Sequence, residues 1–464
     1  MPELVVLWTD GLIWLLVALA VGFAFYTRRH PHLREPWGQV LASRTGVASA
    51  LVLSVFIVIG LLDSIHYRPD RDGAENRTED ILSVFDYVVT PLRIRQEKTY
   101  SAPLATHLFS KETIERPDGT QFRDFPRLKY GGAHLEDPER DRVPDILRTA
   151  LRGLAAATLC TAGLVLLLAW LSGRRRGDGI LPAWNRMWRG QDEFPWRTLI
   201  VTAFVLLAVL WVVSLLGTRY HLLGTDKVGE DVLYQALKSI RTGLVIGTLT
   251  TLVMLPAAIF LGVAAGYFRG WVDDVIQYLY TTLNSIPGVL LIAAAVLMLE
   301  VYMDTHADQF NSLLERADMR LLFLCLILGV TSWTGLCRLL RGETLKLREL
   351  DYVQAAHSFG VSSFAILGRH VVPNVMHIVL ISVVLDFSGL VLAEAVLSYV
   401  GIGVDPTTQS WGNMINSARL ELAREPVVWW SLVAALLFMF TLVLAANLFS
   451  DVVRDAFDPR MRDR

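Results

Sequence analysis

The sequence predicts an all-α membrane protein that crosses the bilayer about nine times. Of its 464 residues, 53% are hydrophobic and only 19% are charged, whereas a soluble domain carries about 25% charged residues. The apolar residues gather in runs of roughly 18 or more, long enough to cross a hydrocarbon layer about 30 Å thick. Inside that layer every backbone N–H and C=O must be paired within its own segment, so each run is expected to be a helix.

Nine candidate spans follow one another along the chain. They cover residues 4–26, 47–62, 154–171, 198–216, 242–267, 271–299, 321–340, 372–397 and 427–448. The first is expected to remain as an anchor, because no basic segment precedes it and no small-residue cleavage site follows it. The three cysteines, Cys160, Cys325 and Cys337, lie in or at the ends of apolar runs and are expected to serve packing.

Four clusters of basic residues predict the orientation of the chain. They are Arg28, Arg29, Arg34 and Arg44 after the first span, Arg174, Arg175, Arg176, Arg186, Arg189 and Arg197 after the third, Arg338, Arg341, Lys346, Arg348 and Arg369 between the seventh and eighth, and Arg454, Arg460, Arg462 and Arg464 at the end. Short cytoplasmic loops are rich in Lys and Arg. All four clusters are therefore expected in the cytoplasm, with an external N-terminus, a cytoplasmic C-terminus and an odd number of spans.

The chain is expected to have two parts. An N-terminal extension contains two spans within residues 1–62, a proline-rich external segment at 63–147 and a third span within 148–172. A basic cytoplasmic linker, 173–197, contains Trp184, Trp188 and Trp196 and leads to a six-span unit at 198–464. The external segment contains both charge signs, which does not conflict with the orientation because long loops translocate largely regardless of charge.

The loop between the seventh and eighth spans is the most informative stretch. Residues 351–359 predict a short amphipathic helix that stops at Gly360, where a residue free to adopt positive φ suits the end of a helix. A second short helix is expected before Pro373, which marks the start of the next span. We call residues 351–373 the knob. Its Ala355-Ala356 pair leaves one face small enough for another protein to approach, although packing on its own subunit is the simpler interpretation by composition alone.

Specific residues of the knob resemble the signature loop of binding-protein-dependent ABC importer permeases. That loop reads E-A-A, three residues, G, then about a dozen residues to a Pro, and here Gln354-Ala355-Ala356, Gly360 and Pro373 match it. In the family this loop is the coupling helix, which sits in a cleft of a cytoplasmic ATPase. Gln354 departs from the family's Glu, and His370 stands where many members have an aliphatic residue.

Four further stretches resemble the oligopeptide and dipeptide branch of that family, and they favour its C-type permease. They are residues 221–232, 265–273, 394–404 with 410–414, and 451–460, with Leu222 and Glu230 as departures. The resemblance implies a six-helix type I permease core in a bacterial inner-membrane importer for oligopeptides or dipeptides, working by alternating access. It also implies a second homologous permease, two ATPase subunits that bind ATP and Mg, and an extracytoplasmic solute-binding protein.

Several alternatives and expectations accompany this resemblance. The same branch carries nickel, glutathione and peptide-like antibiotics, and a non-transporting scaffold or signalling protein in the membrane is the alternative from another class. The loop with Gly401, Gly403, Trp411 and Gly412 is expected to contribute to external docking, and the external segment is hypothesised to add to that surface. Membrane lipid is the other expected contact, and no nucleic acid is expected.

Polar residues and prolines inside the spans have two interpretations. Pro256 and Pro287 are either static kinks or bends that line a translocation path. Asp386 should face the bundle or a water-filled path, where it could meet the ammonium group of a peptide, or else pair with a serine or asparagine on a neighbouring helix. Glu394 is expected to be structural and hydrated near the external end, and Asp10 to be structural at the interface.

No motif for catalysis or for cofactor or metal binding is found in this sequence. It contains no G-x-x-x-x-G-K-[ST] phosphate loop, no H-E-x-x-H motif and no Cys/His cluster. The chain is therefore not expected to be an enzyme, and ATP hydrolysis is expected in partner subunits. Gly262 and Gly266 have the small-x-x-x-small spacing that lets a helix approach closely, either from a partner or from within the chain.

Overall fold

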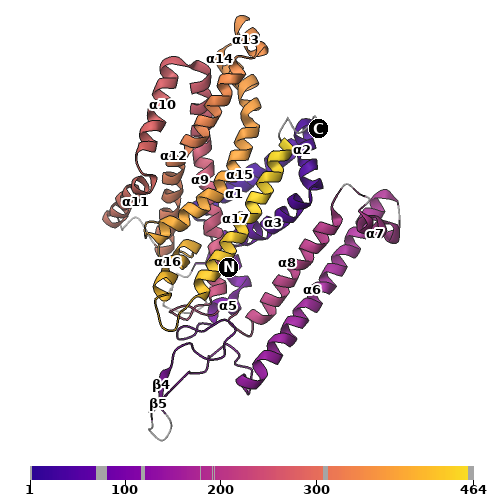
Figure 1. Cartoon of the computed structure of the whole chain (residues 1–464), viewed down its shortest axis with the longest axis vertical. Helices are drawn as coiled ribbons and strands as arrows, with labels where there is room; N and C mark the ends of the chain where they lie inside the picture. The colour runs from indigo at the N-terminus through magenta and orange to yellow at the C-terminus, as the bar shows by residue number, and fades with distance from the viewer. Residues whose placement is uncertain are drawn as a thin grey trace.

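The computed structural model describes residues 3–68, 81–115, 121–177, 179–190, 192, 194–306 and 312–457. Within these residues, nine helices are long and apolar enough to cross a membrane. The predicted all-α polytopic fold is therefore confirmed. The long helices run roughly along one direction, which is vertical in Figure 1.

The N-terminal extension begins with two spans joined by a short helix. Strand β1 (Glu3–Val5) leads into α1 (Trp8–Arg29), α2 (Pro31–Ala42) and α3 (Arg44–Asp63). The Ser43 hydroxyl accepts a hydrogen bond from the Gly46 N–H at 3.2 Å and so caps the start of α3. β1 pairs with β2 (His66–Arg68), which pairs with β3 (Leu82–Ser83), and this small antiparallel sheet joins the start of the chain to the external segment.

The external segment is built from short elements at the end of the molecule opposite the knob. They are α4 (Val84–Val88), α5 (Thr90–Ile94), β4 (Glu112–Glu115) and β5 (Gln121–Asp124). Ser83 and Asp86 form a capping box at α4, each side chain accepting from the other's backbone N–H. The β4–β5 hairpin projects beyond the helical body at the lower end of Figure 1.

The third and fourth spans form a pair beside the main bundle. These are α6 (Pro138–Arg176), which begins well before the predicted span, and α8 (Trp196–Gly217), and the linker between them contains α7 (Ile180–Arg189). Small residues buried at every fourth position of α6 face this contact: Gly153, Ala157, Thr161, Val165 and Ala169. A Cβ on Gly153 would lie 2.9 Å from Val212 Cγ2. The main neighbours of α8 are α6 and α3, so the first helix of the predicted six-span unit packs with the extension (Figure 1).

Two long helices make the centre of the bundle. α9 (Val232–Phe268) packs along α12 (Leu313–Arg348), the largest helix contact in the molecule. A Cβ on Gly262 would lie 2.7 Å from the Cys337 carbonyl oxygen, and one on Gly266 would lie 2.7 Å from the Arg341 carbonyl oxygen. The two glycines therefore serve a close contact within this chain, which decides between the two alternatives left by the sequence.

The two prolines have different consequences. Pro256 lies inside α9, which continues through it. Pro287 divides the predicted span 271–299 into α10 (Gly270–Ser285) and α11 (Gly288–Thr305), which run in different directions in Figure 1. The sixth predicted span is therefore interrupted at Pro287. Proline disfavours the helical conformation of the residue before it, and Ile286 has extended angles, φ −92° and ψ 128°.

The remaining elements are the knob and two spans. After α13 (Asp351–Ser358) and α14 (Ser363–Ile366), a π-helical turn at Leu367–Val371 continues into α15 (Val372–Tyr399), followed by α16 (Trp411–Glu421) and α17 (Trp430–Phe457). α2, α7, the knob and the chain's C-terminus gather at the upper end in Figure 1. The described parts of the four basic clusters thus share one end of the molecule; Arg460, Arg462 and Arg464 lie outside the described residues.

Candidate functional site

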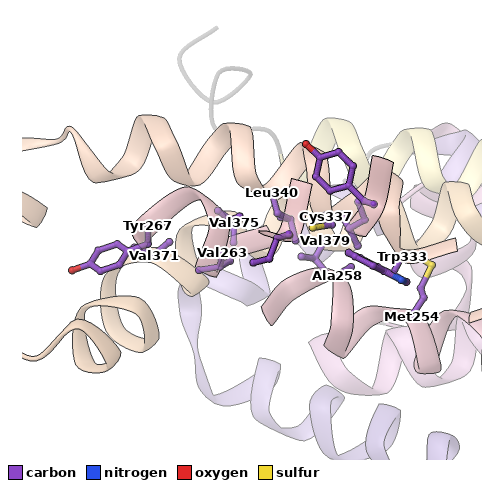
Figure 2. Packing of buried hydrophobic residues seen from close by; sticks show 14 of the residues in the cluster. Met254, Ala258, Val263, Tyr267, Trp333, Cys337, Leu340, Val371, Val375 and Val379 are labelled. Carbon is purple, nitrogen blue, oxygen red and sulfur yellow. The ribbon is translucent and has the colours of Figure 1, made fainter. Parts of the chain in front are cut away.

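The knob is anchored by a row of buried apolar side chains. Val353 of α13, Ile366 of α14 and Val371 of the π-helical turn are at most 2% exposed, and they join a core cluster with residues of α9 and α12. Figure 2 shows Val371 beside Tyr267, in the same cluster as Val263 of α9 and Leu340 of α12. The knob therefore packs directly on the central α9–α12 pair.

The backbone at Gly360 has the predicted conformation. Its φ is +75°, a left-handed value that glycine adopts without the steric cost of a Cβ. The Gly360 N–H donates to the His357 carbonyl at 3.0 Å, and the Val361 N–H donates to the Ala356 carbonyl at 3.1 Å, which terminates α13. Pro373 lies in the first turn of α15 as predicted. The expected second helix is not separate, because α14 runs through the π-helical turn into α15.

The free surface of the knob combines small and aromatic side chains. Gln354 and Ala355 are exposed, and Ala356 is half-buried against the anchoring cluster. Phe359 and Phe364 are 86% and 77% exposed. Large exposed aromatic residues on a loop are typical of a surface that another protein covers.

An ion pair that the sequence analysis did not single out supports the base of the knob. The Arg341 guanidinium of α12 donates to both oxygens of Asp273 of α10, with Nε–Oδ1 2.5 Å and Nη2–Oδ2 2.7 Å. Asp273 closes the matched stretch 265–273, and Arg341 belongs to a predicted basic cluster. Each residue thus lies in a stretch that the sequence singled out, but no pattern in the sequence indicated that the two form a pair.

Three of the four residues predicted for external docking are buried. The Trp411 indole N–H donates to the Ala236 carbonyl at 3.0 Å. A Cβ on Gly403 would meet Ser398 Oγ at 2.0 Å, and one on Gly412 would meet Ser398 Cβ at 2.6 Å. These residues hold the loop against α9 and α15, whereas Gly401, with φ +85°, is exposed. Contact with a partner must therefore come from the exposed residues of this loop.

A cleft of about 250 Å³ opens where the external segment meets the loops of the later spans. Tyr100 contributes from the external segment, and Asp226, Glu230, Glu421 and residues 406–409 line the other walls. The external segment and the loop 401–414 are thus parts of one continuous surface.

Buried ion pairs join the extension to the external end of α9. The Arg241 guanidinium donates to Asp10 Oδ1 at 2.6 Å and to Thr9 Oγ1 at 2.9 Å, and it lies 3.6 Å from Asp318 Oδ1 of α12. His66 Nδ1 lies 2.8 Å from the other oxygen of Asp10. Asp10 is 1% exposed, so its carboxylate is enclosed by the protein, in keeping with a structural role.

One turn before Arg241, Lys238 makes a second set of contacts with the extension. Its Nζ donates to Asp63 Oδ1 at 2.9 Å and to Asp86 Oδ2 at 2.6 Å. The Tyr234 hydroxyl donates to the other oxygen of Asp86 at 2.8 Å. Tyr234, Lys238 and Arg241 follow one another at helical spacing and form a polar stripe at the start of an apolar helix. This stripe is the sequence signal that could have predicted the contact with the extension.

His221 forms a third link outside the spans. Its Nδ1 lies 2.7 Å from Asp231 and its Nε2 lies 3.3 Å from Glu97 of the external segment. Glu97 also accepts from the backbone N–H groups of residues 129–131. Burial by itself disfavours the charged forms of His221 and Glu97. The hydrogen bonds and opposite charges favour these forms more strongly, so the pKa of His221 is raised to about 9 and the pKa of Glu97 is lowered to about 2.

The two carboxylates of α15 have different surroundings. Glu394 is 2% exposed and accepts from the Ser398 hydroxyl at 2.7 Å, so its carboxylate is enclosed by the protein. Asp386, midway along α15, is half-buried, and its carboxylate has no hydrogen bond or ion pair to any described residue. The predicted path residues Asp386, Pro256 and Pro287 come from α15, α9 and the α10–α11 break, and each is at least partly exposed.

A bundle of membrane-spanning helices with an anchored, exposed knob at one end defines a membrane transport subunit. Residues 258–463 match the family described as binding-protein-dependent transport system inner membrane component. The described part of the chain contains no group of three or more His, Cys, Asp or Glu residues placed to hold a metal ion.

Curated relatives agree with this match. The chain is 34% identical over 246 residues to the oligopeptide transport system permease protein OppC of Mycobacterium tuberculosis, covering 53% of this chain and 78% of that protein. It is 31% identical over 242 residues to the glutathione transport system permease protein GsiD of Pectobacterium atrosepticum, covering 52% and 73%. It is 26% identical over 242 residues to the dipeptide transport system permease protein DppC of Bacillus subtilis, covering 52% and 69%. The chain therefore belongs to the binding-protein-dependent permeases, multi-pass proteins of the inner membrane.

Proposed function

We propose that this permease imports peptides and is driven by partner ATPases that dock on the knob. The anchored knob with its exposed face supports the proposal most directly. Val353, Ile366 and Val371 connect the knob to α9 and α12, so closure of an ATPase pair beneath it reorients the central helices. ATP and Mg bind to those partners, and this chain supplies the mechanical contact through Gln354, Ala355, Ala356, Gly360 and Pro373.

The solute class follows from what the relatives are named for. OppC, DppC and GsiD are named for oligopeptides, dipeptides and glutathione. These share amide bonds, a free amine and carboxylates. A path for them requires polar groups within the bilayer and a second homologous permease to close its other side.

Asp386 is the proposed polar group of that path. A carboxylate at mid-span costs about 2.5–3.5 kcal/mol on insertion scales, so it does not face lipid. Since no described residue of this chain pairs with it, its face of α15 is turned toward the path and the second permease. Pro256 and the break at Pro287 are exposed irregularities of the helical backbone. Such irregularities are tolerated within a membrane where a helix lines a cavity.

The extracytoplasmic solute-binding protein docks on the surface that the loop 401–414 and the external segment share. The cleft beside Tyr100 makes this surface continuous, and the projecting β4–β5 hairpin extends it (Figure 1). With this docking surface outside, the C-terminus and the knob lie in the cytoplasm and the N-terminus lies outside.

Co-purification from the native host in mild detergent tests the ATPase contact. A Phe359→Ser chain should lose the ATPase that accompanies the native chain, because the change removes an exposed aromatic residue without touching the core. Gly360→Glu should act likewise. Leu181→Ser, on α7, is the matched control because it is also large, apolar and 77% exposed, and it should retain the ATPase. A folded native chain that brings no ATPase under any nucleotide condition would favour the scaffold alternative.

A hairpin variant tests the external surface. Replacing residues 113–123 by two glycines removes the β4–β5 hairpin but keeps Glu97 and Tyr100. Affinity for the binding protein should fall while the ATPase remains bound. Unchanged affinity and uptake would remove the external segment from the docking surface.

A further inference from the structure

We propose that α7 is an interfacial helix that binds the anionic phospholipid surface of the cytoplasmic leaflet and thereby fixes the α6–α8 pair against it. The proposal rests on the orientation given under Proposed function. It concerns a surface that lies away from the knob, the external cleft and the path residues.

The depth of α7 follows from the spans on either side. At 1.5 Å per residue, the end of α6 at Arg176 lies about 20 Å beyond the middle of the apolar run 154–171. The hydrocarbon edge lies about 15 Å from the bilayer centre. The chain therefore enters α7 at the level of the lipid headgroups, and α8 takes it back into the membrane from Trp196. Figure 1 shows α7 capping the cytoplasmic end of the α6–α8 pair.

The side chains of α7 fall into sectors that suit this position. Met187 is 2% exposed and faces inward. Leu181, Trp184 and Trp188 follow at i, i+3 and i+7, so they lie within about 60° of one another on the helix. They are 77%, 39% and 53% exposed, and the two indoles are stacked with centroids 6.2 Å apart. Tryptophan is enriched where membrane meets water, because its ring is apolar and its N–H is polar.

Basic residues border this apolar face. Arg189 is exposed at the end of α7, on the side away from Met187. Arg174 lies over the Trp170 ring at 5.4 Å, and Arg197 donates from its Nε to the Trp188 carbonyl, which ties the end of α7 to the start of α8. An apolar, tryptophan-bearing face bordered by arginines is the pattern of a helix that lies in a bilayer surface and attracts anionic lipid.

This contact would have a mechanical consequence. The α6–α8 pair makes its main contacts with α3 and not with the central α9–α12 pair. The bundle therefore holds this pair mainly through α3, and lipid contact through α7 supplies a second restraint at the cytoplasmic end.

Hydrogen exchange on the full-length chain, with its accompanying subunits, tests the proposal. The protein is placed in nanodiscs of phosphatidylcholine alone or with 30 mol% phosphatidylglycerol. Amides of residues 183–190 should exchange about fivefold more slowly per engaged arginine in the anionic discs, and 0.5 M NaCl should remove the difference because it screens exposed charge. Arg189→Gln should reduce the difference by about fivefold, whereas Arg419→Gln, on the external helix α16, should leave it unchanged.

A double variant, Trp184→Ser with Trp188→Ser, should lose protection of this segment in both disc types. The amides of α9 report in the same experiment that the bundle remains folded. Equal exchange of residues 183–190 in detergent and in both discs would overturn the proposal, as would an anionic preference that Arg189→Gln leaves intact. ATPase co-purification is independent of these readouts, so failure here is distinguishable from failure of the proposed function.

Discussion

The two ends of this permease are stabilised by different interactions. At the end opposite the knob, which we propose to be external, Arg241, Lys238 and His221 pair with buried carboxylates, most of them from the extension. At the cytoplasmic end, the knob rests on apolar side chains, and its outer face shows Phe359 and Phe364 to the surroundings. The first end is held by charges that are paired within the chain, whereas the second leaves an aromatic surface exposed.

This difference indicates where the molecule is expected to move. Separating a buried ion pair leaves a charge without a partner in a medium of low dielectric constant, which is costly. Apolar contacts are non-directional and tolerate small displacements. We therefore expect the external end of α9 to stay fixed to the extension while the knob transmits motion at the opposite end. The four predictions below alter one end at a time.

Removing Arg241 should have the largest effect. Arg241→Ala leaves Asp10 and Asp318 buried without their cation, and breaking such a pair costs about 3–5 kcal/mol. Thermal unfolding in detergent should show a large loss of stability, and limited proteolysis should cut the extension. Arg424→Ala, whose ion pair with Glu421 is half exposed, should change stability by at most about 1 kcal/mol. Equal effects of the two variants would refute the fixed external end.

The external end should also weaken at alkaline pH. The pKa of His221 is raised from its usual 6.5 to about 9, so its stabilising contribution is complete below pH 6.5 and disappears as pH rises through 9. That loss amounts to at most about 3 kcal/mol. The pKa of Glu97 is lowered to about 2, so its contribution is complete above about pH 4.5 and disappears as pH falls through 2. The unfolding temperature between pH 6.5 and 9 should fall for the native chain and much less for His221→Gln.

Crowding the α9–α12 contact should have an intermediate effect near the cytoplasmic end. Gly262→Ala places a methyl group 2.7 Å from the Cys337 carbonyl oxygen, and overpacking of this kind costs about 1–3 kcal/mol. Gly335→Ala, on α12 but with open space around its Cβ, is the control and should be neutral or stabilising. Both are read out by thermal unfolding, and the prediction is wrong if the two variants match.

The smallest effect on folding is expected at the knob itself. Gly360→Ala forces a Cβ into a φ of +75°, at a cost of about 1–2 kcal/mol that is confined to the end of α13. Uptake should fall much more than the unfolding temperature does. Gly368→Ala, in the π-helical turn with open space around it, is the comparison that should preserve both. If Gly360→Ala lowered stability as much as Arg241→Ala, the knob would be part of the folding core.

Local features of the sequence were sufficient for the spans and for the end of the knob helix. Each apolar run was long enough to require a helix, and Gly360 could adopt a conformation that other residues avoid. The buried positions of Trp411, Gly403 and Gly412 were not predictable in this way, because a glycine required by a close approach looks like one required by a turn. Their orientation was decided by packing against the end of α15 at Ser398 and by the contact with Ala236, which lies 175 positions from Trp411 in the chain.

The sequence by itself determined the class of protein, the number of spans and the place of the knob, since these depend on run length and on the φ preference of single residues. The tertiary structure decided that Pro287 divides a span while Pro256 does not, because each outcome depends on the helices that surround the freed backbone. It also decided that Arg241 meets Asp10, 231 positions earlier in the chain, and that α8 packs with α6 and α3. Such contacts are set by the relative positions of whole helices, which no local pattern of residues encodes.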